Sequence, residues 1–434
     1  MPTFPELKPR YLWTATLIAA SSITWPASAS TEVDVGPYVP FVDARSAIVR
    51  VGTASPSTAE LSIHPSTGGE TVRLPASSGL RFHDFRVEGL QPATSYAYEI
   101  SIDGIPTSGT LTTASTDPSR PWSFVLYGDS RTDDAAHAKV VESIVKLPSD
   151  FLLQTGDLVD HGEDQEAWKR FFHIERELLR SRALFVTVGN HDLTGRFTRT
   201  RKDFLRLFGS ASARPYFSFR WGNARLYVLD AMDSWNGKQA SWLRNTLEAN
   251  KQEQGVAHRF VAIHHGPFSS GPHGPNERFV SAGFVDILRE GGVDLILAGH
   301  DHIYERGDVG GLKYIVSGGA GAPLYDVSTP TNGSQRRSSV YHFVHIRVDG
   351  ARVEAATSDA EGRLIERCGF AGGEGWTCDP NVSAPNPADM AAEHKRARCG
   401  CSTPGAGRAG LEWLVLPLFW AIRRIRDART TTAS

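Results

Sequence analysis

Apolar and polar positions follow one repeated pattern between residues 122 and 359. Short runs of Val, Leu, Ile and Phe stop at a Gly or directly at a polar residue, which is typical of buried strands. Stretches with helical periodicity separate some of these runs, for example at residues 164–180 and 238–250. The alternation of buried strands with amphipathic helices predicts a layered α/β domain over residues 122–359.

Residues 32–115 follow a different pattern. Apolar and polar residues alternate there over short segments, and Ser-Pro, Gly-Gly and Asp-Gly pairs separate the segments. Such regularly spaced short strands predict a small all-β sandwich ahead of the α/β domain. Residues 116–121, with two prolines, are expected to link the two regions.

Several apolar runs of the α/β region end in a polar side chain. At the carboxyl end of a strand in an open α/β sheet, such a residue lies at the rim, where these folds assemble their sites. Carboxylate, amide and imidazole groups bind hard divalent or trivalent cations, so the pattern predicts a binuclear metal site. The residues are Asp129, Asp157, Asn190, Asp230, His264 and His300, with His302 two positions further on.

The composition is that of an ordinary globular protein. Of the 434 residues, 40% are apolar and 22% are charged, and the length exceeds that of one typical domain. The net charge of −2 gives no indication of a nucleic-acid partner. None of the four cysteines lies among the polar strand ends, so cysteine is expected to supply neither a nucleophile nor a metal ligand.

The N-terminus has the features of a secretory signal peptide. Lys8 and Arg10 precede the mostly apolar residues 11–20, and Ala29 closes a small-residue cleavage signal. The apolar stretch is shorter than the ~20 residues that a membrane-spanning helix needs. We therefore expect residues 1–29 to be removed on export.

The C-terminus combines cysteines, small residues, an apolar run and arginines. Cys399 and Cys401 precede a Gly/Pro-containing segment, the apolar residues 411–422 and three arginines. In this order the features of residues 399–434 resemble the C-terminal sorting tails of myxobacterial exported proteins. The resemblance implies that the tail is processed and that it attaches the protein to the membrane or cell surface. The alternative is an amphipathic terminal helix with two unrelated cysteines.

Residues 360–398 lie between the α/β domain and this tail. Cys368 and Cys378 close a Gly-rich loop of a size suited to a disulfide, which an exported setting permits. The following residues are rich in Pro, Ala and Asn. We expect a cysteine-containing loop and then a surface linker.

Five short blocks follow one another through the α/β region. They are Gly128-Asp129, Gly156-Asp157, Gly189-Asn190-His191-Asp192, Val261-x-x-His264 and Gly299-His300-Asp301-His302. In this order they resemble the blocks of the calcineurin-like metallophosphoesterases. The continuation at residues 303–306, the Gly-rich residues 317–321 and the preceding β region are similar to the purple acid phosphatase branch. Residues 89–98 resemble the leucine–proline–tyrosine corner of fibronectin type III domains.

This resemblance implies a fold and an activity. The fold would be a four-layer αββα sandwich preceded by a small fibronectin type III-like sandwich. The activity would be metal-dependent hydrolysis of phosphate esters, of the acid phosphatase type, with phosphomonoesters favoured. A hydroxide on the metals would attack phosphorus in line, because metal binding lowers the pKa of water towards neutrality.

The resemblance also implies a ligand set for each of two metal ions. Fe, Mn and Zn all accept oxygen and nitrogen ligands, so the metal identity stays open. One carboxylate would bridge the two ions. The first ion would be bound by Asp129, Asp157 and His302, and the second by Asp157, Asn190, His264 and His300.

Four more residues are candidates for the substrate side of the site. His191 directly follows a ligand and would stabilise phosphoryl oxygens or protonate the leaving group, with Asp192 orienting it. His273 lies in a Gly/Pro-rich loop at a place comparable to a substrate-contacting histidine of purple acid phosphatases, or is simply solvated. Arg131 has a planar fork that suits a phosphate oxygen, or forms a salt bridge at the rim.

Two positions depart from the family pattern. Purple acid phosphatases carry a tyrosine three residues after the second-block Asp, and this ligand gives their ferric colour. This chain has Asp160 there, so the colour is expected to be lost, and whether Asp160 binds a metal stays open. Other metallophosphoesterases often have a histidine two residues after the first Asp, where this chain has Arg131, which cannot bind a metal.

Some neighbouring polar residues are expected to have structural roles. Asp230 matches no ligand block, so a structural hydrogen bond is expected for it. His265 is the neighbour of a ligand, because the Val261-x-x-His264 spacing sets the register. The basic residues from Arg196 to Lys202 would steer an anionic substrate or form a solvated face.

Two other functions compete with phosphate-ester hydrolysis. Gly128-Asp129-Ser130 resembles the serine block of lipase-like esterases, but the Asp-x-x-His that such an enzyme needs is missing after Asn190. The second alternative is a surface-binding protein on a catalytically inactive metallophosphoesterase scaffold. The preference for monoesters or diesters, the physiological substrate and the oligomeric state stay open.

Overall fold

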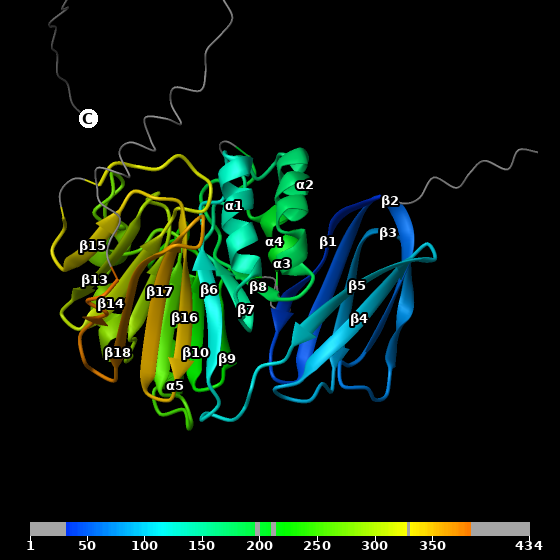
Figure 1. Cartoon of the computed structure of the whole chain (residues 1–434), viewed down its shortest axis with the longest axis horizontal. Helices are drawn as coiled ribbons and strands as arrows, with labels where there is room; N and C mark the ends of the chain where they lie inside the picture. The colour runs from blue at the N-terminus through cyan, green and yellow to red at the C-terminus, as the bar shows by residue number, and fades with distance from the viewer. Residues whose placement is uncertain (1–31, 196–199, 210–213, 328–329, 383–434) are drawn as a thin grey trace, which may run out of the picture. The chain divides into compact units, whose positions relative to one another are not determined.

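The structure is a computed structural model that describes residues 32–195, 200–209, 214–327 and 330–382 (Figure 1). The predictions for residues 1–29 and 399–434 therefore lie outside the described residues. Within the described ranges the chain forms two sheets, of 12 and seven strands, and seven helices. None of these helices is long and apolar enough to cross a membrane.

The region predicted to be all-β contains only strands. The second strand pairs antiparallel with the first along its first half and with the fourth along its second half, while the third strand pairs along both halves. The fifth strand pairs with the fourth. The five are β1 (Val33–Val42), β2 (Ser46–Pro65), β3 (Val72–Glu88), β4 (Ser95–Ile102) and β5 (Ile105–Thr112).

The predicted tyrosine corner of this region is present. The hydroxyl of Tyr96 accepts a hydrogen bond of 2.8 Å from the amide of Gln91, and Leu90 beside it is buried. The assignment of the whole segment to the fibronectin type III class stays a prediction. The segment is joined to the following domain, because Val39 of β1 pairs in parallel with Ala183 of β8.

The first sheet of the α/β region has a parallel centre and an antiparallel extension. Three neighbouring strands run parallel, and four later strands are added antiparallel beyond the first of them. The parallel strands are β6 (Trp122–Tyr127), β7 (Phe151–Gln154) and β8 (Ala183–Val186). The added strands are β16 (His342–Asp349), β17 (Arg352–Asp359), β18 (Leu364–Ala371) and β19 (Thr377–Cys378).

The last two of these strands correct the prediction of a cysteine-containing loop at the start of residues 360–398, whereas residues 383–398 of the predicted linker lie outside the described residues. Strand β18 pairs antiparallel with β17, and Ile365, Cys368 and Phe370 are buried. The glycines of the surrounding segment favour a loop, but the burial of these side chains against the sheet stabilises a strand instead. Cys368 forms the predicted disulfide with Cys378, which lies opposite it on β19.

The second sheet has four parallel strands at its centre, β10, β11, β12 and β14, and antiparallel strands at its edges. In spatial order the strands are β15 (Ser334–Ser338), β13 (Tyr304–Val309), β14 (Leu312–Ser317), β12 (Leu295–Ala298), β11 (His258–Ile263), β10 (Ala224–Leu229) and β9 (Phe217–Trp221).

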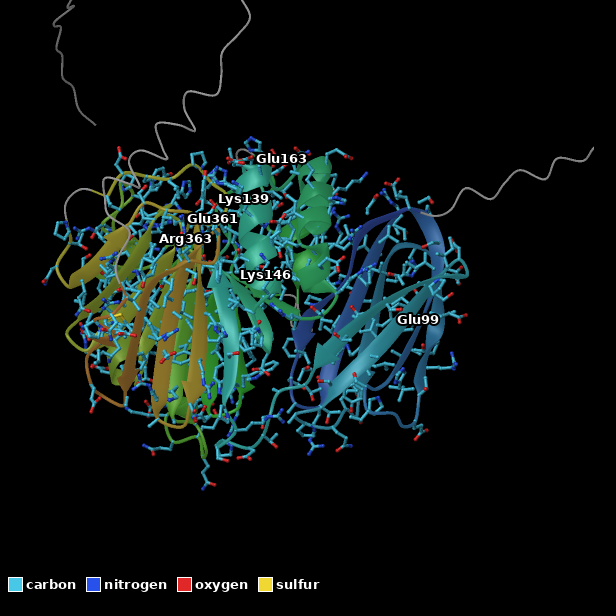
Figure 2. All side chains as sticks on the ribbon, viewed as in Figure 1. Glu99, Lys139, Lys146, Glu163, Glu361 and Arg363 are labelled. Atoms are coloured by element: carbon cyan, nitrogen blue, oxygen red, sulfur yellow. A yellow bond between two sulfur atoms is a disulfide. The ribbon has the colours of Figure 1, made fainter. Side chains whose placement is uncertain are left out.

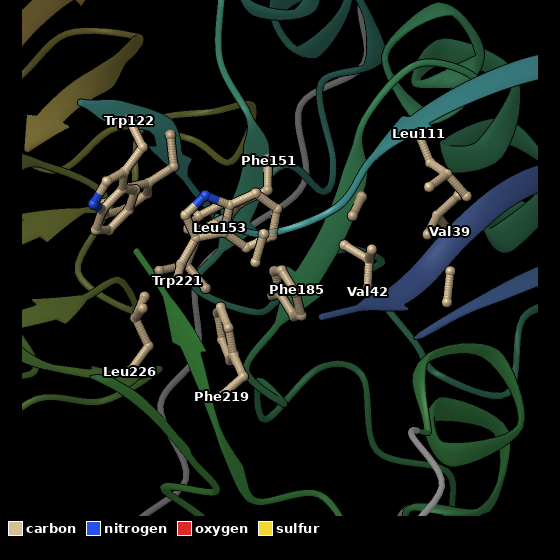
Figure 3. Packing of buried hydrophobic residues seen from close by; sticks show 14 of the residues in the cluster. Val39, Val42, Leu111, Trp122, Phe151, Leu153, Phe185, Phe219, Trp221 and Leu226 are labelled. Carbon is tan, nitrogen blue, oxygen red and sulfur yellow. The ribbon is translucent and has the colours of Figure 1, made fainter. Parts of the chain in front are cut away.

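The two sheets pack face to face, and helices cover their outer faces. Phe151 and Phe185 of the first sheet contact Phe219 of the second across the layer between them (Figure 3). On the outer faces, one apolar cluster joins Val125 to the first four helices and another joins Val261 to the last three. Strands buried on both faces read as continuous apolar runs, as the sequence has them. The αββα order is therefore confirmed.

The helices match the sequence periodicity closely. The predicted helix over 238–250 is α5, and the stretch 164–180 forms two helices, α2 and α3, that meet at the buried Glu175. Exposed charged residues such as Glu99 and Lys146 lie on the outer surface (Figure 2). The helices are α1 (Asp134–Val145), α2 (Gln165–Ile174), α3 (Arg176–Leu179), α4 (Lys202–Phe208), α5 (Lys238–Asn250), α6 (Glu277–Ser281) and α7 (Phe284–Glu290).

Candidate metal centre

The predicted ligands meet where the carboxyl ends of parallel strands from both sheets come together. Hydrogen bonds cross between the sheets at this point. The amide of His300 donates to Asp129 Oδ2 over 2.9 Å, and His264 Nδ1 donates to the carbonyl of Thr155 over 2.7 Å. Asp129, Asp157 and Asn190 follow β6, β7 and β8, whereas His264 and His300 follow β11 and β12.

The backbone at several ligands is held in an unusual conformation. Asp129, Asp157 and His300 have φ angles of 57°, 54° and 72°. For a residue with a side chain, this left-handed region costs about 1–2 kcal/mol. Non-glycine residues with such angles concentrate at functional sites, where the surrounding structure holds them in place.

The glycines that precede the ligands are required by close packing between the loops. A Cβ on Gly189 would lie 2.1 Å from Asp157 Oδ1, and a Cβ on Gly299 would lie 2.5 Å from Asp129 Oδ2. Each of these glycines therefore lets its own loop approach the ligand of another loop. This explains physically why Gly precedes the ligand in the Gly-Asn and Gly-His blocks.

Four ligand atoms converge around His264 and fit a metal ion. Its Nε2 lies 3.1 Å from Asn190 Oδ1, 3.1 Å from His300 Nδ1 and 3.5 Å from Asp157 Oδ1. Because His264 Nδ1 donates its proton to Thr155, Nε2 keeps its lone pair for a metal. Burial lowers the pKa of His264 and of His300, which favours the neutral imidazoles that bind metals.

The other predicted set contains a basic side chain. Arg131 Nε lies 3.4 Å from Asp157 Oδ2, and Arg131 Nη2 lies 3.3 Å from His302 Nε2. Asp129 Oδ1 is 3.7 Å from the same His302 nitrogen and is buried without a hydrogen-bond partner in the structure. Burial, and then the charge of Asp157, raises the pKa of Asp129 well above its usual range. The guanidinium thus lies beside Asp157 and His302, two of the three residues that the sequence assigned to the first ion.

His191 lies at the site, but Asp192 does not orient it. The amide of His191 donates to Asp157 Oδ1 over 2.8 Å, and its Nδ1 donates to the carbonyl of Asp160 over 2.8 Å. Asp192 is fully buried and instead accepts hydrogen bonds from the amides of Asp157, Leu158 and Gly189. The predicted role of Asp192 is corrected, because a buried carboxylate satisfied by three amides fixes the ligand loops rather than a neighbouring ring.

His273 reaches the edge of the site through a contact that the sequence did not indicate. Its Nε2 lies 3.2 Å from the hydroxyl of Tyr325, whose ring stacks on that of His302 with centroids 4.2 Å apart. The amide of His273 donates to Asp301 Oδ1 over 3.0 Å, and Asp301 is buried. Asp301 lies inside the Gly-His-Asp-His block, so that block was the available signal for it. No motif indicated Tyr325.

A cavity of about 490 Å³ opens beside the four-ligand set, which consists of Asp157, Asn190, His264 and His300. Asn190 and His191 line its inner end, and the side chain of His191 is 32% exposed. Asp160, His161 and Glu163 supply the remaining polar wall, and Leu193 supplies an apolar surface. The cavity therefore joins the ligands to solvent along a mixed polar and apolar wall.

Three other residues named from the sequence have structural partners. Asp230 accepts from the amide of Met232 and pairs with Arg201, which confirms its structural hydrogen bonds and gives one member of the basic segment a structural role. His265 Nε2 lies 2.9 Å from the carbonyl of Gly274. Arg196 and Arg199 lie outside the described residues.

Residues 124–304 match the family model of the calcineurin-like phosphoesterases. The chain is 28% identical over 242 residues to the probable purple acid phosphatase 20 of Arabidopsis thaliana, a match that covers 52% of this chain and 55% of the relative. It is 25% identical over 320 residues to the phosphoenolpyruvate phosphatase of Allium cepa, which covers 68% of this chain and 64% of the relative. The first of these matches thus spans about half the length of the relative.

Solved structures share the fold at low sequence identity. The purple acid phosphatase PPD1 from yellow lupin (Lupinus luteus) seeds superposes with a TM-score of 0.66 at 15% identity, covering 77% of this chain and 74% of the other. PhoD superposes with a TM-score of 0.66 at 10% identity, covering 84% and 97%. Residues 124–304 thus match the calcineurin-like phosphoesterases, purple acid phosphatases are among the relatives of the chain, and the solved structures share its fold.

Proposed function

We propose that this chain is a metal-dependent phosphoric ester hydrolase with a preference for phosphomonoesters. The observation that carries the proposal is the convergence of ligand atoms from Asp157, Asn190, His264 and His300, of which Asp157 and His264 are buried. Similarity to purple acid phosphatases and to a phosphoenolpyruvate phosphatase supports the same reaction class. The family uses a binuclear centre, and the sequence predicted two ions of Fe, Mn or Zn.

The four-ligand set would bind one ion of this kind. When bound, such an ion supplies a Lewis acid and lowers the pKa of water from 15.7 towards ~7, so that a nucleophile exists at neutral pH. Asp157 has its other oxygen directed at Arg131, which leaves Oδ1 for the set. The amide of His191 also donates to Oδ1, so the loop after β8 holds the carboxylate in place.

His191 is proposed to act on the substrate. Its Nδ1–H is held by the carbonyl of Asp160, so Nε2 is the ring atom on the side of the ligands, 3.9 Å from Asp157 Oδ2. In the imidazolium form the ring carries a second proton at Nε2, and this proton would be donated to the leaving-group oxygen or hydrogen-bonded to a phosphoryl oxygen, which leaves the neutral ring. The exposure of the ring to the cavity supports this role.

Arg131 and His273 are also proposed to contact phosphoryl oxygens. Arg131 carries a planar, positively charged fork, and its side chain is 13% exposed beside Asp157. His273 is held by two bonds, one from its amide to Asp301 and one between its ring and Tyr325. These bonds place an imidazole next to His300, with ring centroids 4.4 Å apart.

A serine esterase mechanism is not favoured. Ser130 is 1% exposed, and its hydroxyl lies 3.5 Å from the carbonyl of Leu158. A buried hydroxyl directed at a backbone carbonyl is not placed to attack a substrate. The remaining alternative, an inactive scaffold that binds at a surface, is an outcome of the activity test.

The test is release of p-nitrophenol from p-nitrophenyl phosphate by purified protein loaded separately with Mn, Zn or Fe. We expect turnover that EDTA abolishes and that metal restores. Bis(p-nitrophenyl) phosphate tests the preference for monoesters, and phosphoenolpyruvate tests the substrate named for the onion relative. Absence of turnover with every metal and every ester would refute the enzyme and leave the inactive scaffold.

Export to the cell surface or outside the cell is a second part of the proposal. The signal-like residues 1–29 and the tail 399–434 support it, and so does the disulfide between Cys368 and Cys378, since disulfides persist in oxidising compartments. Mass spectrometry of the mature protein from its native cells is expected to give an N-terminus at Ser30. An intact N-terminus would contradict export through this signal.

A further inference from the structure

The guanidinium of Arg131 contacts the atoms that a first metal ion would need. Its Nε lies 3.4 Å from Asp157 Oδ2, and its Nη2 lies 3.3 Å from His302 Nε2. These atoms belong to two of the three residues that the resemblance assigns to the first ion. The side chain is 13% exposed, so these contacts are made in a largely buried place.

The hydrogen-bonding state of His302 agrees with a cation as its neighbour. His302 Nδ1 donates to the carbonyl of Pro323 over 2.7 Å, so Nε2 carries the lone pair. That lone pair is directed at an N–H group of Arg131, which is a donor and never an acceptor. The nitrogen that would bind a metal is thus already used as a hydrogen-bond acceptor.

Asp160 completes the environment of the guanidinium. Its Oδ1 accepts from Arg131 Nη1 over 3.1 Å and from Thr132 Oγ1 over 2.7 Å. Asp160 stands where purple acid phosphatases have their tyrosine ligand, and Arg131 stands where other metallophosphoesterases often have a histidine ligand. The two departures from the family pattern are therefore in contact with each other and form one ion pair.

The two halves of the site differ in charge. The Nε2 atom of His264 has the neutral Asn190 and His300 as neighbours at 3.1 Å and the carboxylate of Asp157 at 3.5 Å. In the other half, an ion at the usual 2.0–2.2 Å from Asp129 Oδ1 and His302 Nε2 would stand beside the guanidinium. A divalent cation and a guanidinium repel each other, most strongly where water is excluded.

We propose that this centre binds a single metal ion, at Asp157, Asn190, His264 and His300, and that the ion pair of Arg131 with Asp160 replaces the first metal and its tyrosine ligand. The inference rests on the ligand assignment of the proposed function. The guanidinium then supplies the positive charge of that half, which would attract a phosphoryl oxygen.

The test is the metal content of the purified full-length protein. The protein is stripped with chelator, saturated separately with Zn, Mn or Fe(II), freed of excess by gel filtration and measured by inductively coupled plasma mass spectrometry. We expect about one ion per chain with each metal, against two for a binuclear centre. Two tightly bound ions per chain, or none, would overturn the single-metal centre.

Two histidine variants locate the ion. His264→Ala is expected to lose nearly all bound metal. His302→Ala is expected to keep about one ion per chain, because the imidazole of His302 accepts a hydrogen bond from Arg131 instead of binding a metal. Loss of metal from His302→Ala with a normal circular dichroism spectrum would show that His302 is a ligand and would contradict the proposal.

A double variant tests the replacement directly. Changing Arg131→Gly together with Asp160→Tyr removes the cation and restores the family ligand, and a second ion per chain is expected. Arg131→Lys is the matched control, because it keeps the positive charge and is expected to stay at one ion per chain. A control that gains the second ion would refute a role for the charge.

The number of bound metal ions tests the single-metal centre, and the hydrolysis of phosphate esters tests the proposed function, so each proposal can be refuted without the other. One ion per chain without turnover on any phosphate ester would refute the proposed function and leave the single-metal centre standing. Turnover with two ions per chain would support the proposed function and refute the single-metal centre.

Discussion

The two halves of the metal centre are built from similar loops, yet they differ in what lies between their side chains. Around His264, the atoms of Asn190 and His300 face one another directly at 3.1 Å. Around His302, the guanidinium of Arg131 lies between the imidazole and Asp157. Matching ligand residues therefore do not describe each half completely, because one basic neighbour changes the charge of the space they enclose.

Burial does not explain this difference. Asp129 and His264 are both fully buried, and His302 is 2% exposed. Burial lowers the pKa of His302 to about 4, and it lowers the pKa of His264 as well. Both halves thus offer neutral imidazoles at neutral pH, and the difference is that the lone pair of His302 is directed at a cationic N–H group.

The largest expected effect comes from removing the central ligand of the open half. In His264→Ala the atom on which the other three ligands converge is lost, so phosphatase turnover is expected to fall to background. Measurement of kcat with p-nitrophenyl phosphate at saturating metal checks this. His265→Ala is the matched control, since His265 bonds to the carbonyl of Gly274. Equal losses in both variants would mean that His264 has no special role.

His191 tests the part of the site that serves the substrate. His191→Ala keeps the amide that donates to Asp157 but removes the ring, so kcat is expected to fall about 10²–10⁴-fold. The metal content is expected to stay nearly unchanged, which separates this residue from the ligands of either half. Loss of metal in this variant would show that its role had been assigned wrongly.

Gly189 tests the packing that holds Asp157 between the two halves. In Gly189→Ala the new Cβ would lie 2.1 Å from Asp157 Oδ1. Overpacking of this kind costs about 1–3 kcal/mol of unfolding free energy, and the displaced carboxylate should also weaken metal binding. Urea denaturation and a metal titration measure the two effects. Gly373→Ala is the control, because its Cβ would meet no atom within 4 Å.

The smallest expected effect lies on the arginine side of the site. Tyr325→Phe removes the hydroxyl that lies 3.2 Å from His273 Nε2 but keeps the ring that stacks on His302. A net hydrogen bond contributes about 0.5–1.5 kcal/mol, so kcat/KM is expected to fall by up to about tenfold. A variant as active as the unmodified protein would remove His273 from the proposed substrate contacts.

The sequence predicted the layered fold well and one segment poorly. Strands buried on both faces leave continuous apolar runs, so β6, β7 and β12 were visible before the structure. Strand β18 was missed because Gly and Cys within and after it suggested a loop. Its burial depends on pairing with β17, which no local pattern records.

The sequence predicted which residues form the site, but it did not predict all of their hydrogen-bond partners. The blocks named the ligands correctly as neighbours, since Asp157, His264 and His300 offer ligand atoms within 4.8 Å of one another. Asp192 was assigned to the ring of His191 because the two are adjacent in sequence. Its carboxylate instead accepts hydrogen bonds from amides of the loop after β7, which lie 34 and 35 positions earlier. Neighbouring positions in the sequence do not show which group a buried carboxylate contacts.

By itself the sequence determined which residues stand at the ends of buried strands, because apolar runs that stop at Gly mark those ends in any fold of this class. Only the tertiary structure decided what those residues face. Arg131 meets His302 across 171 positions because β6 and β12 belong to two sheets that pack face to face. A contact of this kind is fixed by the packing of layers, and in the single-metal proposal it sets the charge around His302.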